Sequence, residues 1–322
     1  MSDHLSLGPG REFDRVRAIA EALGAAATKL GDDCALLQVP SGTLCVSTDV
    51  SVEDTHFHRA WLSADEIGWR ATAAALSDLA AEGATPIAVL VALTLGPGAT
   101  DADAVGLMRG AGQAATSVGA RVVGGDLARG PSVALAVTAL GTAPRPVTRR
   151  GAAPGDELWV TGQLGGARAA LVMFERGRQP HPASRRAFAR PEPRIAAGLQ
   201  LADAGATAML DVSDGLAGDA GHLAAASAVC LEIALDRLPL SEGVVEAAAM
   251  HGMEPAVFAA EGGEDYELLA ALPASAAATL QAASMRGPLP YTRIGRVTEG
   301  SGVRLAFKDR DITLTGYDHF RG

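Results

Sequence analysis

Short apolar runs and longer helix-like segments alternate along the first half of the chain. Three runs have the β-branched, apolar character of strands, at residues 43–47, 87–95 and 133–140. Ser63 and Glu66 have the spacing of a capping box, which predicts a helix from there to about Glu82, before Gly83. A second helix is predicted between residues 101 and 119. The pattern therefore predicts an α/β domain in residues 1–145.

The stretch GTAPRPVTRRGAAPGDELWV is rich in proline and glycine and predicts a domain boundary near residue 145. Beyond it, the pattern predicts strands at 157–160, 231–235 and 267–272, and helices at 165–176, 193–204 and 215–228. The basic segment RGRQPHPASRRAFARPEPR is expected to be exposed. A length of 322 residues, at about 150 per domain, agrees with two domains, 1–145 and 146–322. Both mix helices and strands, so the predicted fold class is α/β (α+β).

Composition excludes several classes of protein. A net charge of −10 argues against nucleic-acid binding. The longest apolar run, residues 87–95, is far shorter than the roughly 18 residues of a membrane span, and the N-terminus lacks the apolar core of a secretory signal. The three cysteines have no metal-type spacing, which favours the cytoplasm. Lys29 and Lys308 are the only lysines, so an anionic substrate would require a divalent metal ion.

Several common active-site motifs are absent from the sequence. It contains no P-loop, no H-E-x-x-H or C-x-x-C zinc signature, and no G-x-G-x-x-G after a predicted strand. The segment DVSDG resembles a nucleophile elbow, but Asp211 stands where the first glycine is needed. A serine hydrolase is therefore a poor interpretation.

Acidic residues with small neighbours follow many of the apolar segments. They occur in the segments GDDCALL, STDV, LSDLAAEG, VGGDLARG, LDVSDG and GGEDYE. Small neighbours allow a ligand to approach the backbone closely, and Mg²⁺ prefers a few carboxylates together with water and phosphate oxygens. The combination predicts metal-bridged phosphate binding.

Each acid also has a structural interpretation when it is taken alone. Asp32 and Asp33 are compatible with a turn, as is Asp126, and Asp49 could end a strand. Asp78 is expected inside a helix, where exposure and a functional role are equally compatible with the pattern. Other candidates also have such readings: a helix cap for Ser213 or Asp214, a solvated side chain for His56 or Arg149, and a packing role for Cys34 or Tyr317.

Taken in order, the motifs resemble the thiamine-monophosphate kinase family, within the superfamily of aminoimidazole ribonucleotide synthetase. The segments that carry the resemblance span nearly the whole chain: GDDCALL, STDVSVEDTHF, LSDLAAEGATP, VGGDLARG, VTRRGAAPGD, LDVSDGLAGDAGHL, GGEDYELL and GYDHF. The resemblance implies a homodimer in which the N-terminal α/β domain forms a barrel-like core with its twofold mate. It also implies a C-terminal mixed α/β domain that completes the site.

The resemblance implies that ATP and thiamine monophosphate give ADP and thiamine diphosphate, with a cluster of Mg²⁺ ions. The implied metal ligands are Asp33, Asp49, Asp78, Asp126, Asp211 and Asp214, assisted by Ser47 or Thr48. The implied ATP contacts are Gly125, Arg149 and Ser213. The implied contacts to thiamine phosphate are His56, Glu264 and the C-terminal aromatic Tyr317.

This chemistry agrees with a site that is rich in carboxylates and poor in lysine. The acceptor phosphate is already ionised, so no general base is needed, and direct transfer without a phosphoenzyme is expected. Other interpretations are a sister enzyme of the superfamily and a non-catalytic nucleotide sensor. Selenide, water dikinase would need a reactive N-terminal cysteine pattern, and the hydrogenase-maturation relative would need a C-terminal cysteine. Neither feature occurs in this chain, which ends in HFRG.

Overall fold

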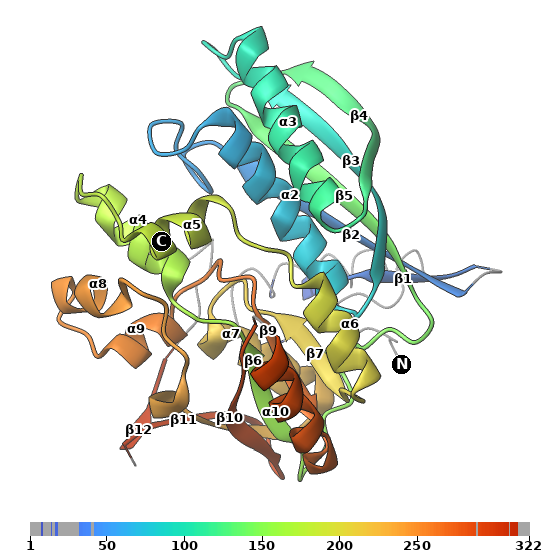
Figure 1. Cartoon of the computed structure of the whole chain (residues 1–322), viewed down its shortest axis with the longest axis vertical. Coiled ribbons are helices and arrows are strands. Elements are labelled where there is room, and N and C mark those ends of the chain that lie inside the picture. The colour runs from blue at the N-terminus through green and yellow to red at the C-terminus, as the bar shows by residue number, and fades with distance from the viewer. Residues whose placement is uncertain are drawn as a thin grey trace.

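The computed structural model describes residues 32–39, 42–287, 289–308 and 310–314, together with residues 8, 14, 17 and 18. It contains two mixed sheets, one in each half of the chain, and helices pack against both (Figure 1). The predicted mixed α/β class is therefore confirmed. Of the described helices, none combines the length and the apolar character that crossing a bilayer requires.

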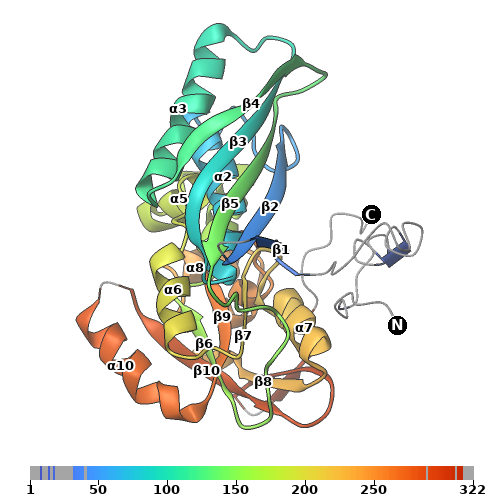
Figure 2. The ribbon, with the colours of Figure 1, turned by 90° about the vertical axis from the view of Figure 1, so that its right-hand side faces the viewer.

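The N-terminal sheet has the strand order β1-β2-β5-β3-β4. Its strands are β1 (Ala35–Val39), β2 (Gly42–Val52), β3 (Thr85–Leu95), β4 (Arg121–Arg129) and β5 (Ala134–Ala143). Helices α2 (Ala64–Ala81) and α3 (Asp101–Ser117) cover one face, and Figure 2 shows the opposite face uncovered. In β5, buried residues alternate with half-buried ones, as expected for a strand with one covered face.

Strand β4 was not predicted, because its centre carries two adjacent glycines. Gly125 has a φ of +153°, and a Cβ atom there would lie 1.9 Å from the carbonyl oxygen of Val91 on β3. A side chain at this position would therefore force the two strands apart. The glycine has a structural reason that is independent of any ligand.

Helix α2 begins at the predicted capping box, in which Ser63 and Glu66 bond to each other's backbone. It packs against α3, β2 and β5 and also contacts α6 (Ile195–Asp203) and β7 (Ala208–Asp211). Close backbone contacts make this possible: a Cβ atom at Gly68 would lie 1.8 Å from the oxygen of Leu107, and one at Gly198 would lie 2.0 Å from the oxygen of Ala80. Helix α2 therefore connects the two halves of the molecule.

The C-terminal sheet has the order β12-β11-β8-β10-β6-β9-β7. Its further strands are β6 (Glu157–Thr161), β8 (Cys230–Ala234), β9 (Leu268–Leu272), β10 (Tyr291–Thr298), β11 (Gly302–Phe307) and β12 (Arg310–Ile312). Its other helices are α4 (Gly166–Glu175), α5 (Pro182–Ala189), α7 (Leu216–Ser227), α8 (Val244–Met250), α9 (Pro255–Ala260) and α10 (Ala277–Arg286), with 3₁₀ turns η2 (Leu235–Arg237) and η3 (Ala274–Ala276). The side chains of β6, β7 and β9 are almost all buried. Strand β7 is the last strand of the sheet and contacts α2.

The expectation that the basic segment 176–194 is exposed was wrong for its second half. Helix α5 forms there, and Phe188 is 2% exposed in the core. Its arginines bind acids elsewhere: Arg185 lies 2.9 Å from Glu66, and Arg194 lies 2.7 Å from Glu267. The proline punctuation suggested a solvated linker, whereas the arginines connect the segment to α2 and to β9.

Candidate active site

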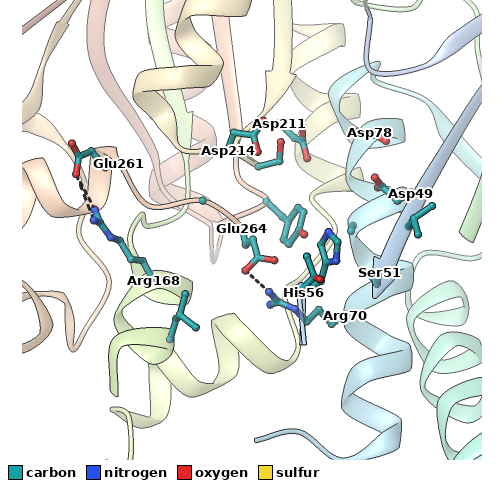
Figure 3. Close-up of a pocket in the computed structure, with 17 residues that line it drawn as sticks. Asp49, Ser51, His56, Arg70, Asp78, Arg168, Asp211, Asp214, Glu261 and Glu264 are labelled. Carbon is teal, nitrogen blue, oxygen red and sulfur yellow. Dashed lines mark hydrogen bonds and ion pairs between the residues drawn. The ribbon is translucent and has the colours of Figure 1, made fainter. Parts of the chain in front are cut away.

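A cavity of about 550 Å³ lies between the two halves, where β2, α2, β7 and the loop before β9 meet. Figure 3 shows its acidic and basic side chains converging from both domains. Seven of the residues predicted for the site line it: Asp49, His56, Asp78, Asp211, Ser213, Asp214 and Glu264. The predicted residues therefore come together in one place, although they are up to 215 positions apart in the sequence.

Three aspartates form the closest carboxylate group in this region. One oxygen each from Asp33, Asp78 and Asp211 lies within 4.8 Å of the others. Asp78 also accepts a hydrogen bond from the hydroxyl of Ser47, and Asp49 lies close enough to raise its pKa. Oxygens at this spacing can share one ion with metal–oxygen distances near 2.1 to 2.4 Å.

Burial and mutual repulsion favour the protonated forms of Asp49, Asp78 and Asp211 when no cation is present. Burial, and secondly the charge of Asp33, raises the pKa of Asp211 to about 8 and that of Asp49 to about 6. Burial, followed by the charges of Asp49 and Asp211, raises the pKa of Asp78 well above its usual range. A positive charge placed among the carboxylates would favour their ionised forms.

Arg149 is bound by the predicted metal ligand Asp33. Its Nε lies 2.9 Å and its Nη2 lies 2.6 Å from the two carboxylate oxygens of Asp33, and its backbone amide donates to Asp32. The Asp33 side chain is only 1% exposed. Asp33 was predicted to bind a metal ion and Arg149 to bind ATP, and the two residues contact each other directly. Neither side chain lines the cavity, so the pair lies on the far side of the acidic group.

The loop that carries Ser213 and Asp214 is fixed by Asp219, whose role the sequence left open. The buried carboxylate of Asp219 accepts hydrogen bonds from the backbone amides of Ser213, at 3.0 Å, and Asp214, at 3.1 Å. Helix α7 begins after Gly215, and no side chain caps it. The helix-cap interpretation of Ser213 and Asp214 was therefore wrong. An acid in the first turn of a predicted helix was the available signal.

The loop before β9 is joined to the same segment by backbone hydrogen bonds. Glu264 donates its amide to the oxygen of Ser213 at 2.7 Å, and Tyr266 donates its amide to the oxygen of Val212 at 2.9 Å. Both residues have positive φ, of 65° and 51°, a sparsely populated conformation for non-glycine residues that occurs often at functional sites. Glu264 lines the cavity, whereas the neighbouring Asp265 accepts the amide of Gly165 before helix α4.

Two arginines that were not predicted also line the cavity. Arg70 forms an ion pair with Glu264, and Arg168 lies 3.4 Å from Glu261 (Figure 3). Arg70 and Asp78 are eight positions apart on α2, with Ala74 between them, so all three share one face of the helix. The sequence contained a signal for Arg70, because an arginine eight positions before Asp78 lies on the same face of a helix.

Seven predicted residues do not line the cavity. Asp33, Ser47 and Arg149 belong to the acidic group beside it or contact that group, and the other four lie further away or cannot be placed. The hydroxyl of Thr48 lies 2.9 Å from that of Thr138, on the uncovered face of the N-terminal sheet. Gly125 and Asp126 are on edge strand β4, where Asp126 is exposed and pairs with Ala92. Tyr317 is outside the described residues. His56 does line the cavity, and its Nδ1 accepts the amide of Val52.

Known proteins match this chain over almost its full length. Residues 31–143 match the N-terminal domain, and residues 153–308 the C-terminal domain, of AIR synthase related protein. The thiamine-monophosphate kinase of Halobacterium salinarum is 38% identical over 290 residues, which cover 90% of this chain and 95% of that protein. The Escherichia coli K12 enzyme is 37% identical over 325 residues, covering 96% of both. The chain belongs to the thiamine-monophosphate kinase family.

Solved structures support the same family assignment. AaThiL complexed with AMPPCP and TMP has a TM-score of 0.85 and 31% identity, and the match covers 97% of each chain. Thiamine monophosphate kinase from Aquifex aeolicus has a TM-score of 0.80 and 30% identity, covering 94% of this chain and 98% of that one. The HypE–HypF complex is 19% identical with a TM-score of 0.79, so it shares the fold.

The raised pKa of Asp211 predicts how this family member responds to pH without metal. The folded protein holds a proton on Asp211 up to about pH 8, whereas an unfolded aspartate releases it near the ordinary value of 3.8. Asp211 therefore destabilises the folded state increasingly as pH rises through this window. In chelator, the Tm of Asp211→Asn minus that of the wild type should grow from about pH 4 to pH 8 and then level off. A difference that is independent of pH in thermal melts would contradict this assignment.

Proposed function

We propose that the chain catalyses transfer of the γ-phosphoryl group of ATP to thiamine monophosphate, giving thiamine diphosphate. The observation that carries the proposal is the convergence of Asp49, Asp78, Asp211 and Asp214 in one cavity of a chain that matches kinases of this name. A related structure was solved with AMPPCP and TMP, which are compatible with a nucleotide and an acceptor phosphate.

The acids fit Mg²⁺ in donor type and in charge. Their oxygens are hard ligands, and the pKa values of Asp49, Asp78 and Asp211 are raised by burial and then by repulsion between the acids, both of which a bound cation would offset. We assign the metal ions to Asp33, Asp49, Asp78, Asp211 and Asp214, with Ser47 orienting Asp78. When bound, Mg²⁺ would offset the repulsion between the two substrates and the charge that develops during transfer. Thr48 and Asp126 stay predictions of the family resemblance.

Each substrate would be contacted by residues from both halves of the chain. Ser213, held in place by Asp219, and Arg149 are proposed to contact ATP, with Gly125 as a further predicted contact. His56 and Glu264 are proposed to contact thiamine phosphate, and Tyr317 is the predicted aromatic partner of the thiamine ring. Because the acceptor oxygen is ionised at neutral pH, none of these residues must remove a proton from it.

We also propose that the uncovered face of the N-terminal sheet binds a second copy of the chain. Four large apolar side chains on this face are exposed: Val50, Ile87, Leu90 and Val123. Exposed apolar side chains gathered on one sheet face are typical of an interface, and twofold dimers are the commonest assembly. Asp126 is in register with Ala92, Ala136 and Val50 on the same face, so it would lie in that dimer interface. Pairing of two such sheets would give the barrel-like core that the family resemblance implies.

The proposed reaction predicts equal amounts of two products and no covalent intermediate. Incubation with ATP, Mg²⁺ and thiamine monophosphate should give one ADP for each thiamine diphosphate, as measured by chromatography. A rapid-quench experiment with γ-labelled ATP should leave no label on the protein, because the acceptor attacks directly. A labelled aspartate or histidine that turns over at the steady-state rate would contradict direct transfer. Intact ATP binding without product would instead indicate a nucleotide sensor.

Substitution of Asp211 tests the metal-ligand assignment. Asp211→Asn should lower kcat by at least roughly 100-fold, because lost charge stabilisation of about 3 kcal/mol has that effect. The fold should persist, since Asp211 is a source of repulsion in the metal-free protein. Asp236→Asn, which makes the same change at an exposed residue, is the matched control and should keep wild-type turnover. Turnover of Asp211→Asn within a few-fold of wild type would rule out the assignment.

Dimerisation is tested by an arginine placed on the uncovered sheet face. Val123→Arg should convert a dimer to a monomer, because a charge would be buried in the apolar interface. Val105→Arg is the matched control, since Val105 is 61% and Val123 is 64% exposed, but Val105 lies on helix α3. Light scattering after size exclusion measures the mass. A monomeric wild-type chain, or identical masses for both variants, would contradict the interface.

A further inference from the structure

A second acidic group lies behind the Asp33–Arg149 pair and is not needed by the proposed reaction. It consists of Asp32, Asp33 and Glu82, and one carboxylate oxygen of each lies within 4.8 Å of the others. Glu82 follows directly after helix α2, four positions after Asp78, so the two acids are one helical turn apart. Asp33 belongs to both groups and connects them.

Glu82 is the unusual member of this group. It is completely buried, and neither of its carboxylate oxygens makes a hydrogen bond of normal geometry among the described residues; the Cys34 amide is a nearby donor. Burial, and then the charges of Asp32 and Asp33, raises its pKa well above the usual range, and the Cys34 amide and Arg149 oppose this shift only in part. An isolated buried carboxylate is costly, because the lost hydration is not replaced. Protonation of Glu82 avoids this cost when no cation is present, and a cation beside it would offset the cost with the carboxylate ionised.

The nearby positive charge is too small for the three acids. Among the described residues, Arg149 is the only cation within ion-pair distance of any of them, and it contacts Asp33 and Asp32. If all three carboxylates ionise, the charge of Arg149 leaves two negative charges unbalanced. The position is unfavourable as well, because the C-terminal turn of α2 contains no basic residue and carries the negative end of the helix dipole.

The surrounding donors indicate which cation would fit. The three ligand side chains offer carboxylate oxygens and neither a thiolate nor an imidazole, the ligands that structural zinc sites use. Carboxylate oxygens are ligands for hard cations, and each oxygen of Asp33 has a lone pair left beside its bond to Arg149.

We propose that Asp32, Asp33 and Glu82 bind a divalent hard cation of the Mg²⁺ or Mn²⁺ class, separate from the ions of the catalytic cavity. The ion would balance the two remaining charges, and water could complete its shell on the side of Asp32, which is partly exposed. It would hold the C-terminal end of α2 to the segment before β1 and so fix the Asp33–Arg149 pair. Its function would be structural, since neither Asp32 nor Glu82 lines the cavity.

Metal binding without nucleotide tests this site directly, with Mn²⁺ as the probe in equilibrium dialysis of the full chain. Wild-type protein should bind one more Mn²⁺ per chain than Glu82→Gln, and Asp32→Asn should lose the same ion. Glu246→Gln, on the exposed surface, is the matched control and should lose none. The Glu82→Gln loss should persist in an Asp211→Asn background, which disables the catalytic group. Equal Mn²⁺ binding by wild type and Glu82→Gln, or a loss that disappears in that background, would overturn the proposal.

Thermal melts give an independent measurement that does not depend on activity. In chelator, Glu82→Gln should melt at a higher temperature than wild type, because it removes a repulsive buried acid. Saturating Mn²⁺ should reverse or close this difference, since only the wild type gains the bound ion. If no ion binds at Glu82, the difference between the two melting temperatures would not respond to Mn²⁺. That outcome would also overturn the proposal.

Discussion

Repulsion between carboxylates that are held close together is the constraint on which this structure depends. Asp33, Asp78 and Asp211 come from three separate segments, and each would release its proton easily in water. Burial instead raises the pKa of Asp78 and Asp211. A flexible protein would relieve this strain by separating the acids. The fold must therefore be rigid here. A positive charge from outside, such as metal-bound nucleotide would provide, would then offset the repulsion.

Helix α2 supplies that rigidity, and the low aromatic content is part of the reason. Alanine and glycine allow backbones to approach each other closely, as at Gly110, where a Cβ atom would lie 1.9 Å from the oxygen of Asp65. One continuous hydrophobic core contains Leu76 and Leu79 of α2 together with Met209 and Leu268 of the C-terminal half. Close packing therefore fixes the acids of α2 and β7 relative to each other.

Local pattern was enough to predict about half of the described helices and strands and to point to most of the acids that line the cavity. The capping box at Ser63 depends on neighbours within a few positions, so the sequence contains the required information, whereas the short strand β7 that ends at Asp211 was not predicted. Strand β4 was missed because its glycines are explained only by the closeness of Val91. The Asp33–Arg149 pair likewise joins residues 116 positions apart, and no local pattern specifies such a contact.

Adjacent acids with different environments mark the limit of motif-based assignment. In GGED, Glu264 faces the cavity and Asp265 binds the amide before α4, although the two are chemically alike. The same division separates Asp33, which joins two acidic groups, from Asp32, which accepts the backbone of Arg149. What distinguishes the members of each pair is the direction of the side chain and the charge around it. A motif identifies where carboxylates gather, whereas the burial and partners of each oxygen decide whether it can bind a cation.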